Sequence, residues 1–175
     1  MQRYILMTRI FLLSDTHSYI DDRILHYAQE ADQVWHAGDI GDFKVTESLE
    51  KLGTLKAVHG NIDDHTMRAA YPETLYFEVE GVKILMTHIA QYPGRYTPPI
   101  RALLAKHPCD LFVSGHSHIL KVMRDPKLGH MHLNPGAAGT HGFHKVRTAL
   151  KFVIHNGNIN DLQVIEFGER GRLKS

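Results

Sequence analysis

The sequence has little cysteine, no long apolar run and almost no net charge. Cys109 is the single cysteine among 175 residues, which excludes a disulfide within the chain and leads us to expect a reducing, cytoplasmic location. Lysine and arginine number 20 against 19 aspartates and glutamates, so the charge does not indicate a nucleic-acid partner. No stretch approaches the roughly 20 consecutive apolar residues of a membrane span, so we expect no membrane association.

The start of the chain superficially resembles a secretory leader, because apolar residues follow Arg3. However, Arg9 interrupts the apolar run, Ser14 and Asp15 close it, and no small-residue cleavage pattern follows. We therefore expect a short buried strand at Ile10–Leu13 and no leader.

Hydrophobic residues make up 43% of the chain and charged residues 22%, a mixture typical of globular proteins. We find no linker, low-complexity segment or internal repeat. This predicts one domain over residues 1–175, with its core at about 9–167 and a frayed tail at 168–175.

Strands and helices are predicted to alternate in the first two thirds of the chain. The predicted strands, each followed by glycine or polar residues, are Arg9–Leu13, Gln33–His36, Leu55–His59, Val82–Met86 and Asp110–Val113. The predicted helices are Asp21–Glu30, Phe43–Leu52 and Pro98–Lys106. Such alternation indicates an α/β protein with a partly parallel sheet.

Hairpins are predicted elsewhere. Gly81 separates a strand at Leu75–Glu80 from the next one, and Asn156-Gly157 separates two later strands. The later strands are Ile119–Arg124, His130–Leu133, Ala149–His155 and Ile159–Phe167. One half of the sheet structure is therefore expected to be parallel and the other antiparallel.

Histidine is abundant, with 14 residues, and several follow predicted strands. The metal-competent side chains at strand ends are Asp15, His17, Asp39, Asn61, His88, His116 and His118. Ligands in α/β proteins bind beyond the carboxyl ends of parallel strands, so these side chains are predicted to converge on one metal site.

Five motifs occur here in a fixed order: Asp-x-His, Gly-Asp, Gly-Asn, a single His, and Gly-His-x-His. In this order they resemble the calcineurin-like metallophosphoesterases, over nearly the whole chain. The short length and the Asn134-Pro135-Gly136 turn look most like the small bacterial and archaeal phosphodiesterase branch. The resemblance implies a four-layer α-β-β-α sandwich, with two mixed β-sheets flanked by helices and the metal site at the carboxyl ends of the strands.

The resemblance also implies two divalent ions, each with three ligands. One set is Asp15, His17 and His118; the other is Asn61, His88 and His116; Asp39 bridges the two ions. A hydroxide that bridges the ions would attack the phosphate ester, because metal binding lowers the pKa of water. Imidazole-rich ligands without thiolate favour borderline metals such as Mn, Fe, Ni or Zn over Ca, and the ligand type does not select one of them. The metal we expect is Mn, with Fe, Ni, Zn or Mg as alternatives.

Asn61 and Asp63 are the expected catalytic residues, and Asn61 is also expected to bind substrate. The sequence departs from the family at Ile62, where many members have a histidine that is thought to protonate the leaving group. Either another group supplies the proton, or the substrate has a good leaving group. The alternative donors are His65, His141 and His144.

Some residues have both a structural and a functional interpretation. Asp63 at this position is also typical of a cap for a helix over Asp64–Ala70. Arg95, in the Ala90–Tyr96 loop, is either a solvated residue or a phosphate contact in the substrate-binding site. A second departure from the family is Ala137, where many members have serine after the glycine.

The remaining histidines are given structural interpretations. His36 and His59 either support ligands or pack in the core, and Trp35 is expected to pack there as well. Surface or strand-face positions are expected for His26, His107, His130, His132 and His155.

The function that these patterns favour is a binuclear metal-dependent phosphoesterase, a phosphodiesterase rather than a phosphomonoesterase, acting on a small phosphate ester. The alternative is a non-catalytic metal-binding scaffold of the same fold that acts through protein partners. A nuclease or a cyclic-nucleotide hydrolase would share the metal site, and a homo-oligomer is left open.

Overall fold

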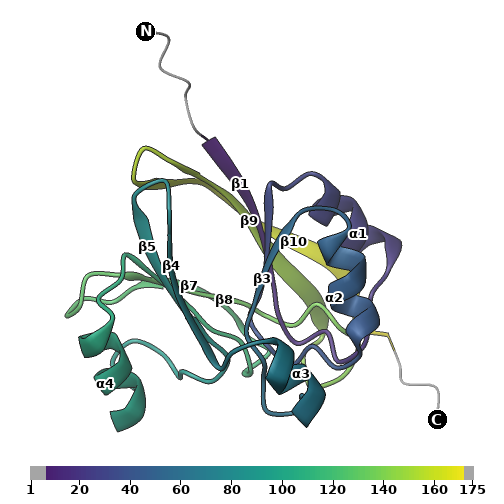
Figure 1. Ribbon diagram of the computed structural model, residues 1–175, viewed down its shortest axis with the longest axis horizontal. Coiled ribbons are helices and arrows are strands. Elements are labelled where there is room, and N and C mark those ends of the chain that lie inside the picture. The colour runs from purple at the N-terminus through teal and green to yellow at the C-terminus, as the bar shows by residue number, and fades with distance from the viewer. Residues whose placement is uncertain (1–6, 172–175) are drawn as a thin grey trace, which may run out of the picture.

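The computed structural model describes residues 7–171, which form two five-stranded mixed sheets (Figure 1). The first sheet has the strand order β10-β9-β1-β2-β3. Its strands are β1 (Met7–Leu13), β2 (Gln33–His36), β3 (Thr54–Ala57), β9 (Val146–His155) and β10 (Asn158–Glu169). Strands β1, β2 and β3 are parallel, so their carboxyl ends meet at one edge.

The second sheet has the order β4-β5-β6-β8-β7. Its strands are β4 (Thr74–Val79), β5 (Val82–Thr87), β6 (Leu111–Val113), β7 (Leu120–Arg124) and β8 (Met131–Pro135). The three central strands are parallel, whereas β4 and β7 pair antiparallel at the two edges.

Helices cover the outer faces of the two sheets. They are α1 (Asp22–Gln29), α2 (Phe43–Glu50), α3 (His65–Ala70) and α4 (Pro98–Lys106). Figure 1 shows α1 and α2 beside the first sheet and α4 on the far side of the second. This arrangement confirms the predicted α/β sandwich of two mixed sheets flanked by helices. None of the helices within residues 7–171 is long and apolar enough to span a membrane.

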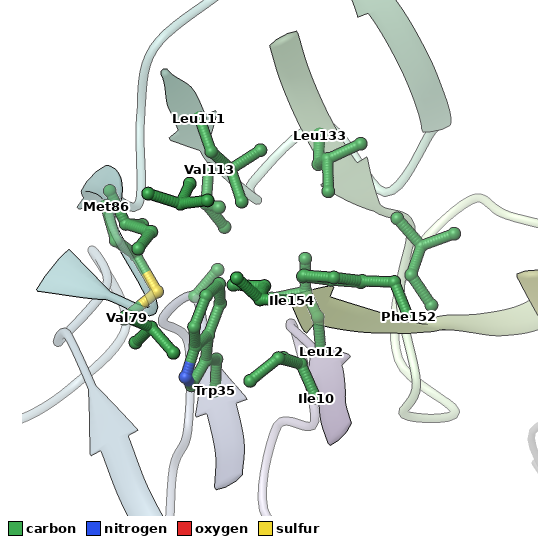
Figure 2. Close-up of a cluster of buried hydrophobic side chains, with 14 of the residues drawn as sticks. Ile10, Leu12, Trp35, Val79, Met86, Leu111, Val113, Leu133, Phe152 and Ile154 are labelled. Carbon is green, nitrogen blue, oxygen red and sulfur yellow. The ribbon is translucent and has the colours of Figure 1, made fainter. Parts of the chain in front are cut away.

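The main core lies between the two sheets (Figure 2). Trp35 on β2 is fully buried there, as predicted, and packs edge-on against Phe77 and Phe152, with ring centroids 5.2 and 5.6 Å apart. Ile10 and Leu12 point into the same core from β1, because alternate residues of a strand share one face. The two sheets are thereby held face to face. The carboxyl ends of the parallel strands of one sheet lie near those of the other.

Local sequence signals placed most elements correctly. The helix expected at Pro98–Lys106 and the strand expected at Gln33–His36 match α4 and β2. Both predicted hairpin turns form, and Asn156 and Gly157 have the positive φ values, 49° and 73°, that such tight turns require.

The prediction that a frayed tail begins at residue 168 is wrong, because Gly168 and Glu169 still pair with β9 at the end of β10. Residues 1–6 and 172–175, which include most of the supposed leader and the end of the tail, lie outside the described part of the chain.

Candidate metal centre

The loops after five strands bring all seven predicted ligand residues to one place. Six of them form two groups in which the ligand atoms lie within 4.8 Å of one another. The first group is Asp15, His17 and His118; the second is Asp39, His88 and His116. Each group combines one carboxylate with two imidazoles, a donor set that suits a divalent transition metal.

Asp39 belongs to the second group and also faces the first. Its Oδ1 is 3.2 Å from His88 Nε2, and its Oδ2 is 3.6 Å from His17 Nε2. Burial opposes its charge, but the hydrogen bond and charge of His88 hold the pKa of Asp39 at about 2. Asp39 is therefore an ionised carboxylate with one oxygen facing each group.

Asn61 completes the second group. Its Oδ1 lies 3.1 Å from His88 Nε2 and 2.9 Å from His116 Nδ1. Since the amide oxygen faces the histidine nitrogens, it is placed as a third neutral donor beside them.

The backbone at the candidate ligands is strained. Ten non-glycine residues among 7–171 have positive φ, and five of them are candidate ligands. These five are Asp15 (55°), His17 (46°), Asp39 (54°), His116 (68°) and His118 (57°). Each such residue costs on the order of 1–2 kcal/mol, and strain of this kind clusters at functional sites.

Two buried polar atoms at the centre have no hydrogen-bond partner among the described residues, namely Asp15 Oδ1 and His17 Nε2. An unpartnered buried polar atom costs free energy that a bound cation would recover. Both atoms belong to the first group and are ordinary metal-ligand atoms. The residues therefore fit a metal ion.

Glycines allow the loops to approach one another. A Cβ on Gly60 would lie 2.1 Å from Asp39 Oδ1, and one on Gly38 would lie 2.6 Å from His88 Nδ1. Gly38 has φ +96°, whereas Gly60 has ordinary φ and is needed for the close approach alone. Any larger residue at these two positions would push candidate ligands apart.

The position of Asp63 suggested that it caps α3, but Asp63 does not do so. Asp64 does so, because its Oδ1 accepts hydrogen bonds from the N–H groups of Thr66 and Met67. The buried carboxylate of Asp63 accepts from Gly60 N (2.7 Å), Gly41 N (2.7 Å) and Ile40 N (3.2 Å). It therefore ties the loop after β2, which carries Asp39, to the loop after β3.

Arg68 was not among the residues predicted from the sequence, although it contacts the loop after β3. Its guanidinium donates to the carbonyl oxygens of Asp63 (2.7 Å) and Asn61 (2.9 Å). It also lines a cavity of about 480 Å³ that reaches Asn61 and His88. Its position in the last turn of the short helix α3, a few residues after the loop, is the signal that could have indicated this contact.

Two candidate ligands are oriented by partners on their other ring nitrogen. His88 Nδ1 donates to the carbonyl oxygen of Ala37 across 2.7 Å, which aims Nε2 at Asp39. Burial opposes charge on His88, but the hydrogen bond to Asp39 and the charge of Asp15 raise its pKa. Such partners fix the tautomer of a metal-binding histidine.

The second oriented histidine is His118. Burial lowers the pKa of His144, so its ring is neutral, and its Nε2–H donates to the carbonyl oxygen of Gly139 across 3.0 Å. His144 Nδ1 then accepts the Nδ1–H of His118 across 3.2 Å. This leaves the Nε2 lone pair of His118 facing Asp15 Oδ1, 3.1 Å away.

A second histidine cluster lies on the outer face of the second sheet. His130 and His132, which were expected at the surface or on a strand face, are only 3% and 0% exposed. Tyr96 Oη lies 3.0 Å from His130 Nε2 and 2.9 Å from His132 Nδ1, and Ser114 Oγ lies 2.8 Å from His132 Nε2. Burial lowers the pKa of His132 to about 4. This cluster is a neutral, hydrogen-bonded network.

His36 is also a packed and satisfied histidine. Its Nδ1 accepts from Gly38 N (3.2 Å), and its Nε2 faces Thr16 Oγ1 (2.9 Å). Burial lowers its pKa to about 4. It joins the two loops that carry Asp15 and Asp39 without facing the candidate ions.

The other candidates are dispersed. Ile62 is exposed at the centre, and its N–H donates to Asp39 Oδ1 across 3.0 Å. Among the possible proton donors, His141 lies against His17, with ring centroids 4.8 Å apart, whereas His65 lies outside the cavities that contain candidate ligands. Arg95 is exposed and lines neither of those cavities, so its role in substrate binding stays a prediction.

Residues 8–157 match the calcineurin-like phosphoesterase superfamily domain. The chain belongs to this superfamily. Among curated proteins, a probable metallophosphoesterase of Methanothermobacter thermautotrophicus is 30% identical over 135 residues, which cover 73% of this chain and 76% of that protein. A probable metallophosphoesterase of Mycoplasma pneumoniae is 32% identical over 119 residues, covering 65% and 69%. Membership implies a metal-dependent phosphoester hydrolase.

Several solved structures share the fold. One described as a novel archaeal phosphodiesterase has a TM-score of 0.62 at 18% identity and covers 91% of this chain and 99% of that one. Vps29 of Entamoeba histolytica in complex with Zn²⁺ has a TM-score of 0.65 at 17% identity, with the same coverage. At these identities the likeness concerns the fold alone.

Proposed function

We propose that the protein is a binuclear metal-dependent phosphodiesterase that acts on small phosphate esters as a single domain, in a reducing compartment such as the cytoplasm. The observation that carries the proposal is Asp39, whose two carboxylate oxygens face two separate ligand groups. Two ions about 4 Å apart repel strongly, and a shared carboxylate offsets that repulsion. In this proposal Asp15, His17 and His118 hold one ion, and Asn61, His88 and His116 hold the other. We prefer Mn, with Fe, Ni, Zn or Mg as alternatives.

When bound, the ions supply positive charge for the phosphate and lower the pKa of a water so that it becomes a nucleophile near pH 7. The chain's own part is to position the substrate. With its amide oxygen facing His88 and His116, Asn61 has its NH₂ group free to donate to a phosphoryl oxygen. Asp63, which we expected from the sequence to be catalytic, has its carboxylate bound to three backbone N–H groups, and in this proposal it acts as a positioning residue for both loops.

Metal removal and restoration test the proposal. After chelation and reloading with Mn²⁺, we expect two ions per chain by mass spectrometry and faster hydrolysis of bis(4-nitrophenyl) phosphate than of 4-nitrophenyl phosphate. Asp39→Asn should lose both the metal and the activity. Asp161→Asn is the matched control, because Asp161 is exposed on β10 and its φ of 52° suits asparagine. Absence of bound metal and of hydrolysis with each of the five metals would refute the proposal.

The alternative is a metal-binding scaffold that acts through protein partners. The Vps29 structures share the fold with this chain, which is what keeps this alternative open. The complete ligand set favours an enzyme, since a scaffold does not need seven converging ligand side chains, five of them on strained backbone. Full metal loading of the unmodified protein without any hydrolysis would support the scaffold instead.

A further inference from the structure

A cavity of about 450 Å³ opens beside the candidate metal centre. His17, Asp39 and His118 are among the candidate ligands that line it. Its lining also includes three exposed apolar residues from separate loops. These are Ile62, Ile119 and Phe143, which are 45%, 55% and 103% exposed. Exposed apolar side chains that gather around a concave site mark a binding surface.

The charge of this cavity limits what it accepts. Among the described residues that line it, none is lysine or arginine, and Asp39 is the only carboxylate. Apart from the imidazoles of His141 and His144, the cavity therefore has no basic side chain beyond the metal centre to bind a second phosphate group. A neutral, apolar group attached to the reacting phosphate fits these walls better than a further nucleotide phosphate does.

The chemistry of residue 62 points the same way. The Ile62 side chain has no proton to give, and its backbone N–H is already bound to Asp39 Oδ1. A leaving oxygen near this residue therefore departs without a proton from it. His144 has its Nε2–H bound to the Gly139 carbonyl oxygen, which leaves His141 as the alternative donor on the cavity wall. Departure without a proton is easy for a phenolic oxygen, whose pKa is about 10, and difficult for an oxygen with a pKa near that of water, about 15.7.

We propose that this cavity, defined by Ile62, Ile119 and Phe143, takes the aromatic ester group of a monoanionic aryl phosphodiester. The inference rests on the proposed function and names its substrate class. In the reaction, a water oxygen forms the new bond to phosphorus and gives its proton to solvent. The bond from phosphorus to the phenolic oxygen breaks, and the aryl oxide leaves with the electron pair and takes a proton from solvent.

Binding of two non-cleavable analogues tests the aromatic contact without turnover. Methyl phenylphosphonate and methyl methylphosphonate are both monoanions, and they differ only in the ring. Calorimetry on the Mn²⁺-loaded protein should give about tenfold tighter binding of the phenyl compound, as expected for one apolar group in a hydrophobic pocket. Phe143→Ala should bring the two affinities close together.

Leu128→Ala is the matched control, because Leu128 is also exposed but lies outside this cavity, in the turn between β7 and β8. It should keep the preference for the phenyl compound. Equal affinities in the unmodified protein, with diester hydrolysis intact, would overturn this inference alone. Failure to bind either phosphonate, together with absence of hydrolysis, would overturn both the inference and the proposed function.

Ile62→His tests the leaving group independently. In the unmodified protein, kcat/KM for a series of methyl aryl phosphates should fall steeply as the pKa of the leaving phenol rises. The histidine introduced at residue 62 should donate a proton to the leaving oxygen and make this dependence shallower. A dependence that is already flat in the unmodified protein would contradict the inference.

Discussion

Two histidine clusters differ in character, one at the carboxyl ends of strands of both sheets and the other around Tyr96 on the outer face of the second sheet. In the first, five candidate ligands have positive φ, and Asp15 Oδ1 and His17 Nε2 have no hydrogen-bond partner. In the second, Tyr96 and Ser114 occupy three of the four ring nitrogens of His130 and His132. A buried histidine thus indicates a metal only where carboxylates, strained backbone and unsatisfied atoms accompany it.

The largest expected effect comes from making the same substitution, histidine to alanine, in each of the two clusters. His118→Ala should lose metal from the first group and lower kcat/KM more than about 100-fold, because even indirect support of a ligand is worth 10–100-fold. His132→Ala should retain full metal content after desalting. If both variants lost metal equally, the contrast between the clusters would be wrong.

The second cluster should matter to stability instead. His132→Ala removes partners from Tyr96 and Ser114 and leaves a cavity, so we expect a loss of about 2–4 kcal/mol in the free energy of unfolding. Urea denaturation measures it. His26→Ala is the control, since His26 is an exposed residue of α1, and it should change stability by less than about 0.5 kcal/mol.

The pH dependence of stability sharpens the same contrast. Burial lowers the pKa of His132 to about 4 in the folded protein, whereas an unfolded histidine titrates near 6.5. Between these values the unfolded chain binds the additional proton. This contribution is therefore intact above pH 6.5 and is lost as pH falls towards 4, by on the order of 3 kcal/mol.

Urea unfolding of the Mn²⁺-free protein at pH 7 and pH 4.5, compared with His132→Asn, isolates the contribution. The variant should lose less stability on acidification than the unmodified protein does. Identical losses in the two proteins would show that His132 does not titrate in this window.

The smallest effect concerns the support of His118. His144→Ala should weaken binding of one ion by about 10–100-fold, because the Nδ1–H of His118 loses its acceptor. His144→Asn keeps an acceptor near the position of Nδ1 and should bind more tightly than the alanine variant. Titration calorimetry with Mn²⁺ measures both, and equal affinities for the two variants would contradict a hydrogen-bonding role.

Sequence patterns predicted the strand ends well, because short apolar runs that stop at glycine or polar residues specify where each parallel strand ends. The convergence of the seven candidate ligands followed from topology alone. His132 does lie on a strand face, that of β8, but the burial of His130 and His132 was not predicted. Local alternation does not reveal that Tyr96, from a distant loop, packs on this face.

Contacts between distant loops could not be predicted. Asp63 and Asp64 are adjacent and chemically identical, yet one caps α3 and the other binds loops on both sides of the centre. The choice depends on where the loop after β2 lies in space. The pairing of His118 with His144 depends in the same way on a glycine-rich segment, since Gly142 has φ +120° and lies against the His118 ring.

The three hydrogen bonds that Asp63 accepts from backbone N–H groups affect how the proposed ions would enter the site. Protein hydrogen bonds, rather than the ions, hold the loops after β2 and β3 together. We therefore expect the proposed ions to bind to the folded protein with little ordering of these two loops, unlike in small zinc domains that fold around their ion. We also expect such a site to exchange its ions with its surroundings. The metal carried in the cell is then decided by supply and by the order of divalent affinities, as much as by the ligands themselves.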